Sequence, residues 1–593
     1  MTGRSTVNAE KEYHSLLRTW LDALLSYVLD KPEHPALDGA IVCPACSMIH
    51  GRCHDAVYPL LCMAERTGES RYLDAAKKLF KWAEYMVCDD GSVYNDSQSE
   101  WCGVTVFAAL SYVKALKFHG HLLSAQERKS WEDRLLRMTD WLKRSISAST
   151  RTNVNYLASN AAYLAQASEY FGDASFMDSA RELAREVLSH VSVNGLIVGE
   201  GGRPDTVTTK GVRPVDMGSN AEETLPSLYE YARAAGDEAV MGEVLGIARA
   251  QLEFYLPDGA LDNSMGTRNY KWTYWGSRTS DGCQALYNAL GKTEPVFAEA
   301  AYRNLELLKS CTDGLLYGGP HYKRHGEYPC AHHAFCHAKV LAQALDEGIA
   351  PFERTDLPSD APPPVKHYPE LGTYRLARGG WRMDVCGSDL VSTRGGQTTG
   401  GTVTLLWNRE YGPVFAVATT DYVLREAHNQ QLSRKKRLQG AVHPRLEVSA
   451  GDALYSQAFD LGVRMESEEQ CGKSMVRAEG TLCDKAHTPL DGSAFSIEYT
   501  LEDNGLLIRG SVNGEGARSA RFVLPVILKT GQSVTLEDDT AEIDGLLKAS
   551  SLTPLRDNGQ VFCLTPGFEA EELWVEPDLS GRFELRLEIV KTE

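Results

Sequence analysis

The chain has 593 residues, of which 43% are hydrophobic and 24% charged, and its formal net charge is −19. This length favours two to four domains, and the negative charge argues against nucleic acid as a partner. No stretch approaches about 18 uninterrupted apolar residues, so we expect no membrane span.

A 3.6-residue hydrophobic period runs through residues 10–347 and predicts about twelve amphipathic helices. The first is expected over residues 16–29. Others are expected to begin near Ala56, Tyr72, Gly103, Ala125, Leu157, Phe176, Ala221, Glu238, Gly282, Val296 and Ala334. Tight turns at 67–70 and 171–174 make the helices they join antiparallel neighbours. This pattern therefore predicts an (α/α)6 toroid, built from six helical hairpins, over residues 1–350.

The character of the chain changes near Ala350. Residues 351–366 contain a proline-rich run, which predicts a stiff linker. Beyond it, segments that alternate apolar and polar residues are separated by Gly, Asp and Asn. Residues 367–593 therefore predict an antiparallel β-sandwich, alone or split into two packed sheets, and the whole chain is an α+β multidomain protein. We expect this domain to be structural, with Arg394 and Gln397 as the residues best placed to reach the toroid.

Six loops hold most of the polar and aromatic residues of the helical part, and each precedes an even-numbered helix. They cover residues 50–55, 94–101, 153–160, 200–223, 263–281 and 321–333. If the helices alternate between an outer and an inner ring, all six loops meet at one end of the toroid. The pattern predicts a deep polar pocket there, typical of small-molecule sites.

Residues 263–281 form the densest of these loops. Aromatic rings stack on sugar rings, and guanidinium groups bind carboxylates through two hydrogen bonds. Carbohydrate binding is therefore predicted for Tyr270, Trp272, Tyr274, Trp275, Arg268 and Arg278. The alternative is a loop that plugs the toroid with buried aromatic side chains.

Two further loops supply polar groups. His321, His332 and His333 lie within a short histidine-rich segment, and imidazole transfers protons near neutral pH. Single histidines in such a segment also serve to satisfy helix-end carbonyls. The 153–160 loop holds Asn153, Asn155, Tyr156 and Asn160, and its side-chain amides could bind a uronate carboxylate. The alternative is that Asn153 or Asn155 caps a helix. His54 and Trp101 are candidates for the pocket rim.

Carboxylates and cysteines give two competing interpretations. A glycoside hydrolase would need a pair of acids, for which Asp216, Glu222 and Glu223 are candidates. Acids that open a helix are also common for the dipole alone. The spacing of Cys43, Cys46, His50, Cys53 and His54 resembles a structural zinc site. Without a second Cys-x-x-Cys, buried free thiols are the favoured interpretation.

The twelve-helix pattern, the proline-rich join and the β-rich C-terminal part together resemble carbohydrate-active enzymes with a toroid followed by a β-sandwich. These are the alginate and heparinase II/III-like polysaccharide lyases and related glucuronidases. The loops at 153–160, 270–278 and 321–333 look like the Asn, Tyr, His and Arg sites of the lyases in residue type and placement. The resemblance covers nearly the whole chain and is architectural.

This resemblance implies β-elimination on a uronic-acid-containing oligosaccharide. Asn155 or Asn160, with Arg268 or Arg278, would neutralise the uronate carboxylate and make C5–H acidic. His321, His332 or His333, or a tyrosine, would remove that proton, and Tyr270 or Tyr274 would protonate the departing O4. We favour the lyase over the glucuronidase-type hydrolase because the loops hold more Asn, His, Tyr and Arg than paired acids. A non-catalytic glycan-binding protein is the third alternative.

We expect no cofactor and no metal in the site. The chain has no phosphate-binding glycine loop, Rossmann fingerprint or nucleophile elbow. A homodimer is possible on this sequence. Fourteen cysteines at irregular spacing suit a reducing compartment. Residues 1–12 show no apolar core of a secretory signal, so the expected location is the cytoplasm.

Overall fold

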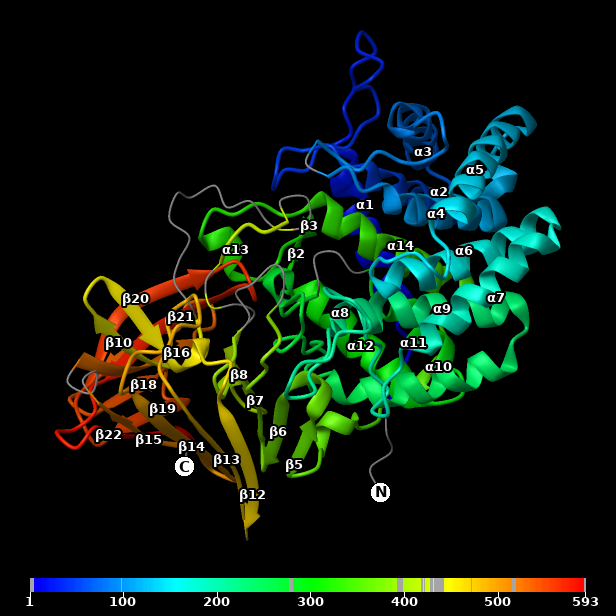
Figure 1. Ribbon diagram of the computed structural model, residues 1–593. Helices are drawn as coiled ribbons and strands as arrows, with labels where there is room; N and C mark the ends of the chain where they lie inside the picture. Colours follow the sequence, from blue (N-terminus) through cyan, green and yellow to red (C-terminus); the bar gives the residue numbers. More distant parts are fainter. Residues whose placement is uncertain are drawn as a thin grey trace.

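The computed structural model describes residues 5–97, 99–276, 281–391, 398–417, 420, 422–426, 430, 442–470, 472–514 and 519–590. Its two parts are a ring of helices, coloured blue to green in Figure 1, and a group of β-sheets that continues to the C-terminus in red. No helix among the described residues is both long and apolar enough to cross a bilayer.

Six inner helices form a closed ring in which each contacts the next. They are α2 (Val57–Thr67), α4 (Thr105–His119), α6 (Val154–Phe171), α9 (Leu225–Ala235), α11 (Gln284–Gly291) and α14 (Ala331–Glu347). Six outer helices each pack on an inner one: α1 (Glu10–Leu25), α3 (Ser70–Ala83), α5 (Ala125–Ser145), α7 (Ala174–Leu188), α10 (Glu238–Gln251) and α12 (Pro295–Ser310). The predicted (α/α)6 toroid of twelve helices is confirmed.

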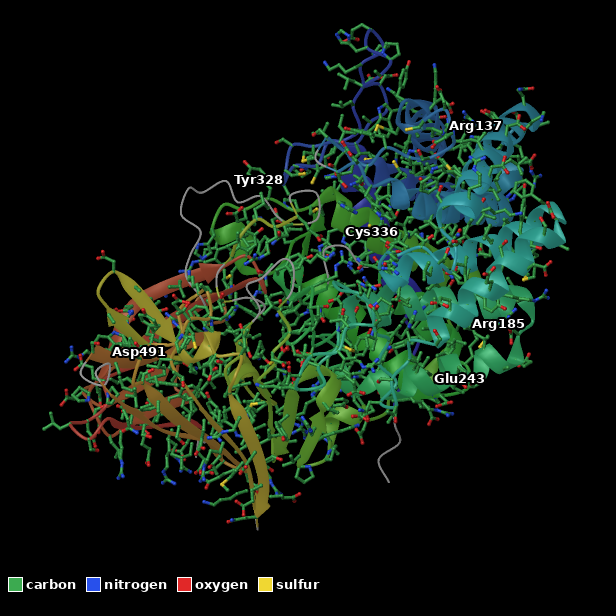
Figure 2. The ribbon with its side chains drawn as sticks, in the orientation of Figure 1. Arg137, Arg185, Glu243, Tyr328, Cys336 and Asp491 are labelled. Carbon is green, nitrogen blue, oxygen red and sulfur yellow. The ribbon has the colours of Figure 1, made fainter. Side chains whose placement is uncertain are left out.

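Burial follows from the composition of the two rings. Inner helices such as α4 and α14 are buried along nearly their whole length, and the buried residues include polar ones such as Lys114, His333 and Lys339. Outer helices are amphipathic, and Figure 2 shows Arg137, Arg185 and Glu243 on their outward sides, whereas Cys336 lies on the inner helix α14. The first helix begins at Glu10, earlier than predicted, because Glu10 and Glu12 occupy its first turn, where acidic residues favour a helix.

Hairpin turns bring each polar loop to the same end of the ring. Gly68, Gly172 and Gly236 end α2, α6 and α9 in the left-handed conformation that glycine adopts without strain. The connections that precede the inner helices are long, and they touch one another. Arg52 binds Asp281 at 2.9 Å, and the Gly282 amide donates to the Glu222 carbonyl. The six polar loops therefore share one face of the toroid.

In the residues that the structure describes, the C-terminal part forms three antiparallel sheets. The first, next to the toroid, is β5 (Val365–Tyr368), β6 (Thr373–Arg378), β7 (Trp381–Cys386), β8 (Thr402–Asn408) and β9 (Gly412–Ala416). A second has the order β11 (Ala453–Ser456), β10 (Arg445–Ala450), β16 (Ala520–Ile527), β21 (Phe568–Val575) and β20 (Leu555–Cys563). The third has eight strands in the order β12 (Arg464–Gln470), β13 (Lys473–Gly480), β14 (Ala494–Glu502), β15 (Gly505–Asn513), β22 (Arg582–Ile589), β19 (Leu547–Ser551), β18 (Thr540–Ile543) and β17 (Val534–Leu536).

The two parts are joined by a continuous apolar core. Leu405, Trp407 and Phe568 from the sheets belong to the same buried cluster as the helices. Strand β1 (Thr6–Val7) pairs with β4 (Phe352–Glu353), so the start of the chain is tied to the segment that leaves the toroid. β4 and the first residues of β5 lie inside the 351–366 segment for which the sequence predicts a linker. The loops that face the sheets are thereby held from both sides.

Candidate functional site

A cavity of about 790 Å³ lies where the toroid loops meet the β-sheet part. Its volume is in the range of small-ligand pockets. Among the residues that line it are Trp101, Asn153, Tyr156, Arg268 and Tyr270 from the polar loops, with Leu390, Val391 and Glu426 from the C-terminal part. Of the residues predicted for the site, Trp101, Arg268 and Tyr270 line this cavity.

Arg268 is the buried cation of the cavity wall, with only 8% of its surface exposed. Its Nη1 lies 3.4 Å from Glu200 Oε2, and its Nη2 lies 3.7 Å from Glu426 Oε2. Gly201 makes this position possible, because its backbone is left-handed (φ 71°) and a Cβ there would approach Arg268 Cγ to 2.9 Å. The guanidinium is therefore held between two carboxyl groups and faces the cavity.

Two tyrosines flank this arginine. The Tyr270 hydroxyl donates to Glu426 Oε1 at 2.6 Å, and burial raises its pKa. Burial also raises the pKa of Tyr156 to about 12, against the opposing effects of Arg268 and the Trp101 indole. The 40% exposed ring of Trp101 meets Tyr156 edge to face at 5.3 Å. Both phenols are thus neutral at pH 7 and can donate a proton.

Glu200 shares its carboxyl group between Arg268 and the α6 N-terminus. The Asn155 amide N–H donates to Glu200 Oε1 at 2.6 Å. Burial raises the pKa of Glu200 to about 8, although Arg268 and this backbone hydrogen bond oppose the rise. At neutral pH Glu200 is therefore mostly uncharged, and it leaves most of the positive charge of Arg268 without compensation.

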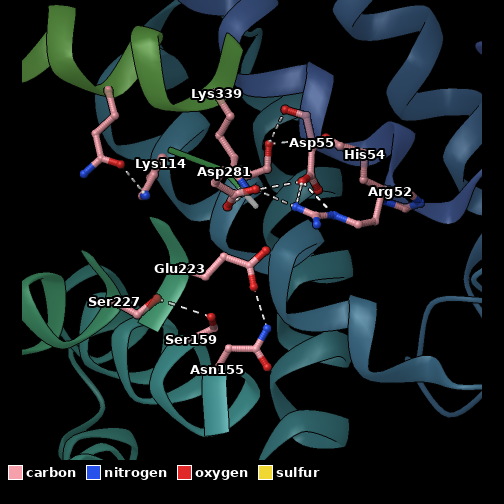
Figure 3. Close-up of polar contacts among 12 residues, drawn as sticks. Arg52, His54, Asp55, Lys114, Asn155, Ser159, Glu223, Ser227, Asp281 and Lys339 are labelled. Carbon is pink, nitrogen blue, oxygen red and sulfur yellow. Dashed lines mark hydrogen bonds and ion pairs between the residues drawn. The ribbon is translucent and has the colours of Figure 1, made fainter. Parts of the chain in front are cut away.

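A group of buried charges lies beside the cavity, at the centre of the ring (Figure 3). Asp55 and Asp281 each accept from both Arg52 and Lys339, at 2.6–3.1 Å. Glu223 projects from a π-helical turn (Asn220–Thr224) toward the same centre and accepts from Asn155 Nδ2 at 2.5 Å. Burial and the nearby Asp281 raise the pKa of Glu223, so its protonated form is favoured.

The aromatic residues that follow Tyr270 point away from the cavity. Tyr274 donates to Asp258 at 2.6 Å and packs on Phe568 of the β-sheet part. Trp272 donates to the Leu261 carbonyl, and Trp275 packs on Phe568 and Tyr274. In this half of the loop the structure matches the alternative interpretation, in which buried aromatic side chains plug the toroid. Arg278, Arg394 and Gln397 lie outside the described residues.

The predicted histidines also lie outside the cavity lining. His321 Nδ1 accepts from the Glu569 amide at 2.9 Å, and burial lowers its pKa to about 4. His332 stacks on Phe335, and the ring of His333 lies 4.7 Å from that of His337. His54 is buried beside the Tyr112 hydroxyl, with a pKa lowered to about 3 by burial. Among the described residues, the histidine that lines the cavity is His190, whose Nε2 is 3.1 Å from Glu186.

The remaining predicted residues have local partners. Asn160 donates to the Ile146 carbonyl at 2.8 Å, which fixes the α5–α6 hairpin. Asp216 caps the short helix α8 (Met217–Ser219) and accepts from Asn263 at 2.6 Å. Neither Asp216 nor Glu222 nor Glu223 lines the cavity. The acids that do, Glu186, Asp205 and Glu426, face His190, Arg203 and Tyr270 respectively.

Sequence reasoning gave no role to Tyr156 and did not consider Glu426. Tyr156 was visible within the 153–160 loop, at the start of an inner helix. Glu426 lies far along the chain in a β-rich segment, and its carboxylate reaches the toroid loop only through the fold. No spacing in the sequence could have paired it with Tyr270.

Comparison with known proteins identifies the family. Residues 17–360 match the model of the ulvan lyase N-terminal domain, and residues 365–591 match that of the ulvan lyase C-terminal domain. The chain belongs to the ulvan lyase family. It is 33% identical over 576 residues to a broad-specificity ulvan lyase of Formosa agariphila, covering 94% of this chain and 90% of that protein.

The fold is similar to that of a solved polysaccharide lyase. A chondroitin AC lyase of Streptomyces coelicolor A3 superimposes with a TM-score of 0.56 at 12% identity, covering 98% of this chain and 83% of that one. The heparan sulfate lyase HepC of Pedobacter heparinus gives a TM-score of 0.47 at 11% identity, covering 91% of this chain and 76% of that one, which is too weak to bear on the fold. The lyase interpretation of the sequence is confirmed by the family.

Proposed function

We propose that this protein cleaves ulvan by β-elimination next to a uronate residue. The observation that carries this proposal is the grouping of Arg268, Tyr156 and Tyr270 on one wall of the cavity. A lyase needs one group to neutralise the carboxylate and groups that move protons, and this wall supplies both. The Formosa agariphila relative, named an ulvan lyase, supports the choice of polysaccharide.

Arg268 is the proposed partner of the uronate carboxylate. A guanidinium remains charged at any working pH and can bind a carboxylate through two parallel hydrogen bonds. Because burial keeps Glu200 largely protonated near neutral pH, Arg268 retains charge for the substrate. Stabilising the carboxylate as C5–H is lost lowers the barrier to proton removal.

Tyr270 is the proposed proton acceptor and Tyr156 the proposed donor. The Tyr270 oxygen takes the proton from C5 as its own proton passes to Glu426, 2.6 Å away. The electron pair of the C5–H bond forms the C4=C5 double bond. The C4–O4 bond breaks, and Tyr156 protonates O4. This reverses the role that the sequence suggested for Tyr270, because its hydroxyl already donates to a carboxylate.

The test is a product analysis. Ulvan is incubated with the enzyme while the ultraviolet absorbance of the conjugated unsaturated uronate is followed, and the products are weighed by mass spectrometry. An elimination adds no water to the products, whereas a hydrolysis adds one water for each bond cleaved. Products that carry the added water and lack the absorbance would overturn the proposal.

Variants then test the two tyrosines. Tyr156→Phe and Tyr270→Phe should each lower kcat by about 10²–10⁴, the usual contribution of general acid–base catalysis. Tyr170→Phe is the matched control, because Tyr170 lies near the far end of the same helix as Tyr156 and donates to Glu132. Tyr274→Phe separates this proposal from the sequence-based one. If Tyr274→Phe abolished turnover while Tyr156→Phe did not, the proton donor would be Tyr274.

We also propose a cellular location and an oligomeric state for the enzyme. We infer a cytoplasmic location, supported by the finding that none of the described cysteines forms a disulfide. Cell fractionation tests this, and enzyme found outside the cell would contradict it. A homodimer is tested by the mass of the protein in solution.

A further inference from the structure

A cluster of sulfur and imidazole groups lies where the helical ring closes. Cys43, Cys46 and His50 belong to the segment between α1 and α2, and Cys330 is the N-cap residue of α14. Cys43 Sγ lies 3.9 Å from Cys330 Sγ, and Cys46 Sγ lies 3.3 Å from His50 Nε2. Residues from the two ends of the helical part are thereby brought together at one point.

The backbone around Cys43 and Cys46 folds into a tight turn. Ser47 N–H donates to the Cys43 carbonyl at 2.8 Å, and Cys43 N–H donates to the Met48 carbonyl at 2.9 Å. Ser47 has a φ of 58°, which lets the chain turn sharply after the second cysteine. The His333 N–H points at Cys330 Sγ at 3.4 Å from the first turn of α14. An N–H directed at sulfur and a helix N-terminus both favour a thiolate.

We propose that Cys43, Cys46, His50 and Cys330 bind a structural Zn²⁺ ion. Zinc takes four such ligands tetrahedrally, with Zn–S of about 2.3 Å and Zn–N of about 2.0–2.1 Å. Those bond lengths put neighbouring donors about 3.8 Å apart for two sulfurs and about 3.5 Å for sulfur and nitrogen. The separations of 3.9 and 3.3 Å match both values.

The four donors as a set are spaced more widely than a closed tetrahedron requires. Within the described part of the chain, the groups whose donor atoms all lie within 4.8 Å of one another are Cys62–His119–Asp346 and Asp55–Asp281–Cys336. Both of these already hold cations. Arg52 and Lys339 occupy the second, while Arg66 lies 3.5 Å from Asp346 in the first. Zinc binding at Cys43 therefore requires the ligand side chains to move closer together.

Two neighbours support the choice of ligands. Asp96 Oδ2 lies 3.7 Å from His50 Nδ1, so a carboxylate faces the ring nitrogen opposite the one that meets Cys46, as is usual for zinc-bound histidines. Cys53, which the sequence spacing included in the set, instead lies 3.5 Å from the Ile41 carbonyl. Cys330 therefore replaces Cys53 as the fourth ligand.

The proposed ion would fasten the first inner connection to the last inner helix. Gly51 N–H donates to the Asn95 carbonyl at 2.6 Å, so the segment that follows His50 also touches the loop that carries Trp101. Fixing this contact would hold the cavity rim in place while leaving the reacting atoms to Arg268 and the tyrosines. The expected role is structural, and its loss should lower stability more than kcat.

Metal analysis of the intact protein tests the proposal. Protein purified without chelator from zinc-supplemented cells should contain stoichiometric zinc, and a zinc-edge X-ray absorption spectrum should show three sulfurs and one nitrogen. Cys43→Ser and Cys330→Ser should lose the metal, whereas Cys53→Ser, the matched control, should keep it. Chelation should lower Tm, and added Zn²⁺ should restore it.

Wild-type measurements suffice if the serine variants fail to fold. Replacement of zinc by Co²⁺ should produce the intense sulfur-to-cobalt charge-transfer bands of a thiolate site. Absence of zinc together with a Tm that chelators do not change would overturn the proposal. So would a Cys43–Cys330 disulfide found by mass spectrometry under non-reducing conditions, since its sulfurs would be bonded at about 2.05 Å.

Discussion

Replacing Arg268 by lysine tests whether the cavity wall needs only a positive charge at this position or also the planar guanidinium that binds a carboxylate through two hydrogen bonds. Arg268 lies 3.4 Å from Glu200 and 3.7 Å from Glu426. At an effective dielectric constant of about 20, a full unit-charge pair at such a distance is worth about 4 to 5 kcal/mol before desolvation. Lysine keeps the positive charge that faces Glu426, while Glu200 is mostly neutral near pH 7, so the fold should survive. It loses the planar fork that binds a carboxylate through two hydrogen bonds.

The expected cost falls on catalysis. Losing one donor to a developing anion costs about 2.7–4 kcal/mol, or about 10²–10³ in rate. We therefore expect Arg268→Lys to lower kcat/KM on ulvan by that factor while Tm changes little. The assay is the initial rate of ultraviolet absorbance over a range of ulvan concentrations, with thermal unfolding of the same samples.

Arg203→Lys is the control for this experiment. Arg203 also lines the cavity, but it is exposed and paired with Asp205 at 2.6 Å. Exposed pairs contribute about 0–1 kcal/mol, so its replacement should change kcat/KM by less than about fivefold. If Arg268→Lys stayed within that same range, Arg268 would not be the carboxylate partner and the proposed mechanism would fail.

Three further predictions concern the same cavity. Glu200→Gln should leave the free energy of unfolding near pH 5 unchanged and raise it above pH 8. Folding lifts the pKa of Glu200 from 4.5 to about 8, so the wild-type protein keeps the full contribution of the neutral carboxyl group below pH 4.5. It loses that contribution, at most about 5 kcal/mol, as the pH rises through 8. Urea denaturation at pH 5 and pH 9 measures this, and equal shifts at both would contradict it. Trp101→Ala should raise KM about tenfold, or about 1.4 kcal/mol, with little change in kcat, because its half-exposed ring offers a surface for a sugar and no reacting group; a loss confined to kcat would count against stacking. A cavity of 790 Å³ should accept chain ends or oligosaccharides, so short products should appear before viscosity falls; an early loss of viscosity with few new chain ends would indicate internal cleavage.

The toroid could be predicted because its pattern is local. Hydrophobic periodicity, glycine at helix ends and the spacing of polar loops are all properties of neighbouring residues, and the inner helices begin within a few residues of the expected positions. The convergence of the loops followed from the alternation of inner and outer helices. Arg268, Tyr270 and Trp101 could be chosen because they lie in those loops.

The orientation of side chains within a loop could not be predicted in the same way. Tyr270 and Tyr274 are one helical turn apart in sequence, yet one faces the cavity and the other packs on Phe568. The difference is decided by the β-sheet part, which presents Glu426 to the first and an apolar surface to the second. His321 is held by the amide of Glu569 for the same reason. A residue type predicts what a side chain can do, whereas its partner from the other part of the chain decides where it points.

Asn155 shows how the buried charges at the ring centre bear on the cavity. Its amide nitrogen donates to Glu223 and its backbone N–H donates to Glu200, so both groups are engaged before any substrate arrives. Arg52 and Lys339 carry two positive charges against three carboxyl groups, Asp55, Asp281 and Glu223, and the excess is relieved if Glu223 is protonated, as its raised pKa favours. A protonated Glu223 can still accept from Asn155 through its carbonyl oxygen. Asn155 then acts by holding Glu200 against Arg268, which makes it a positioning residue for the arginine that meets the uronate.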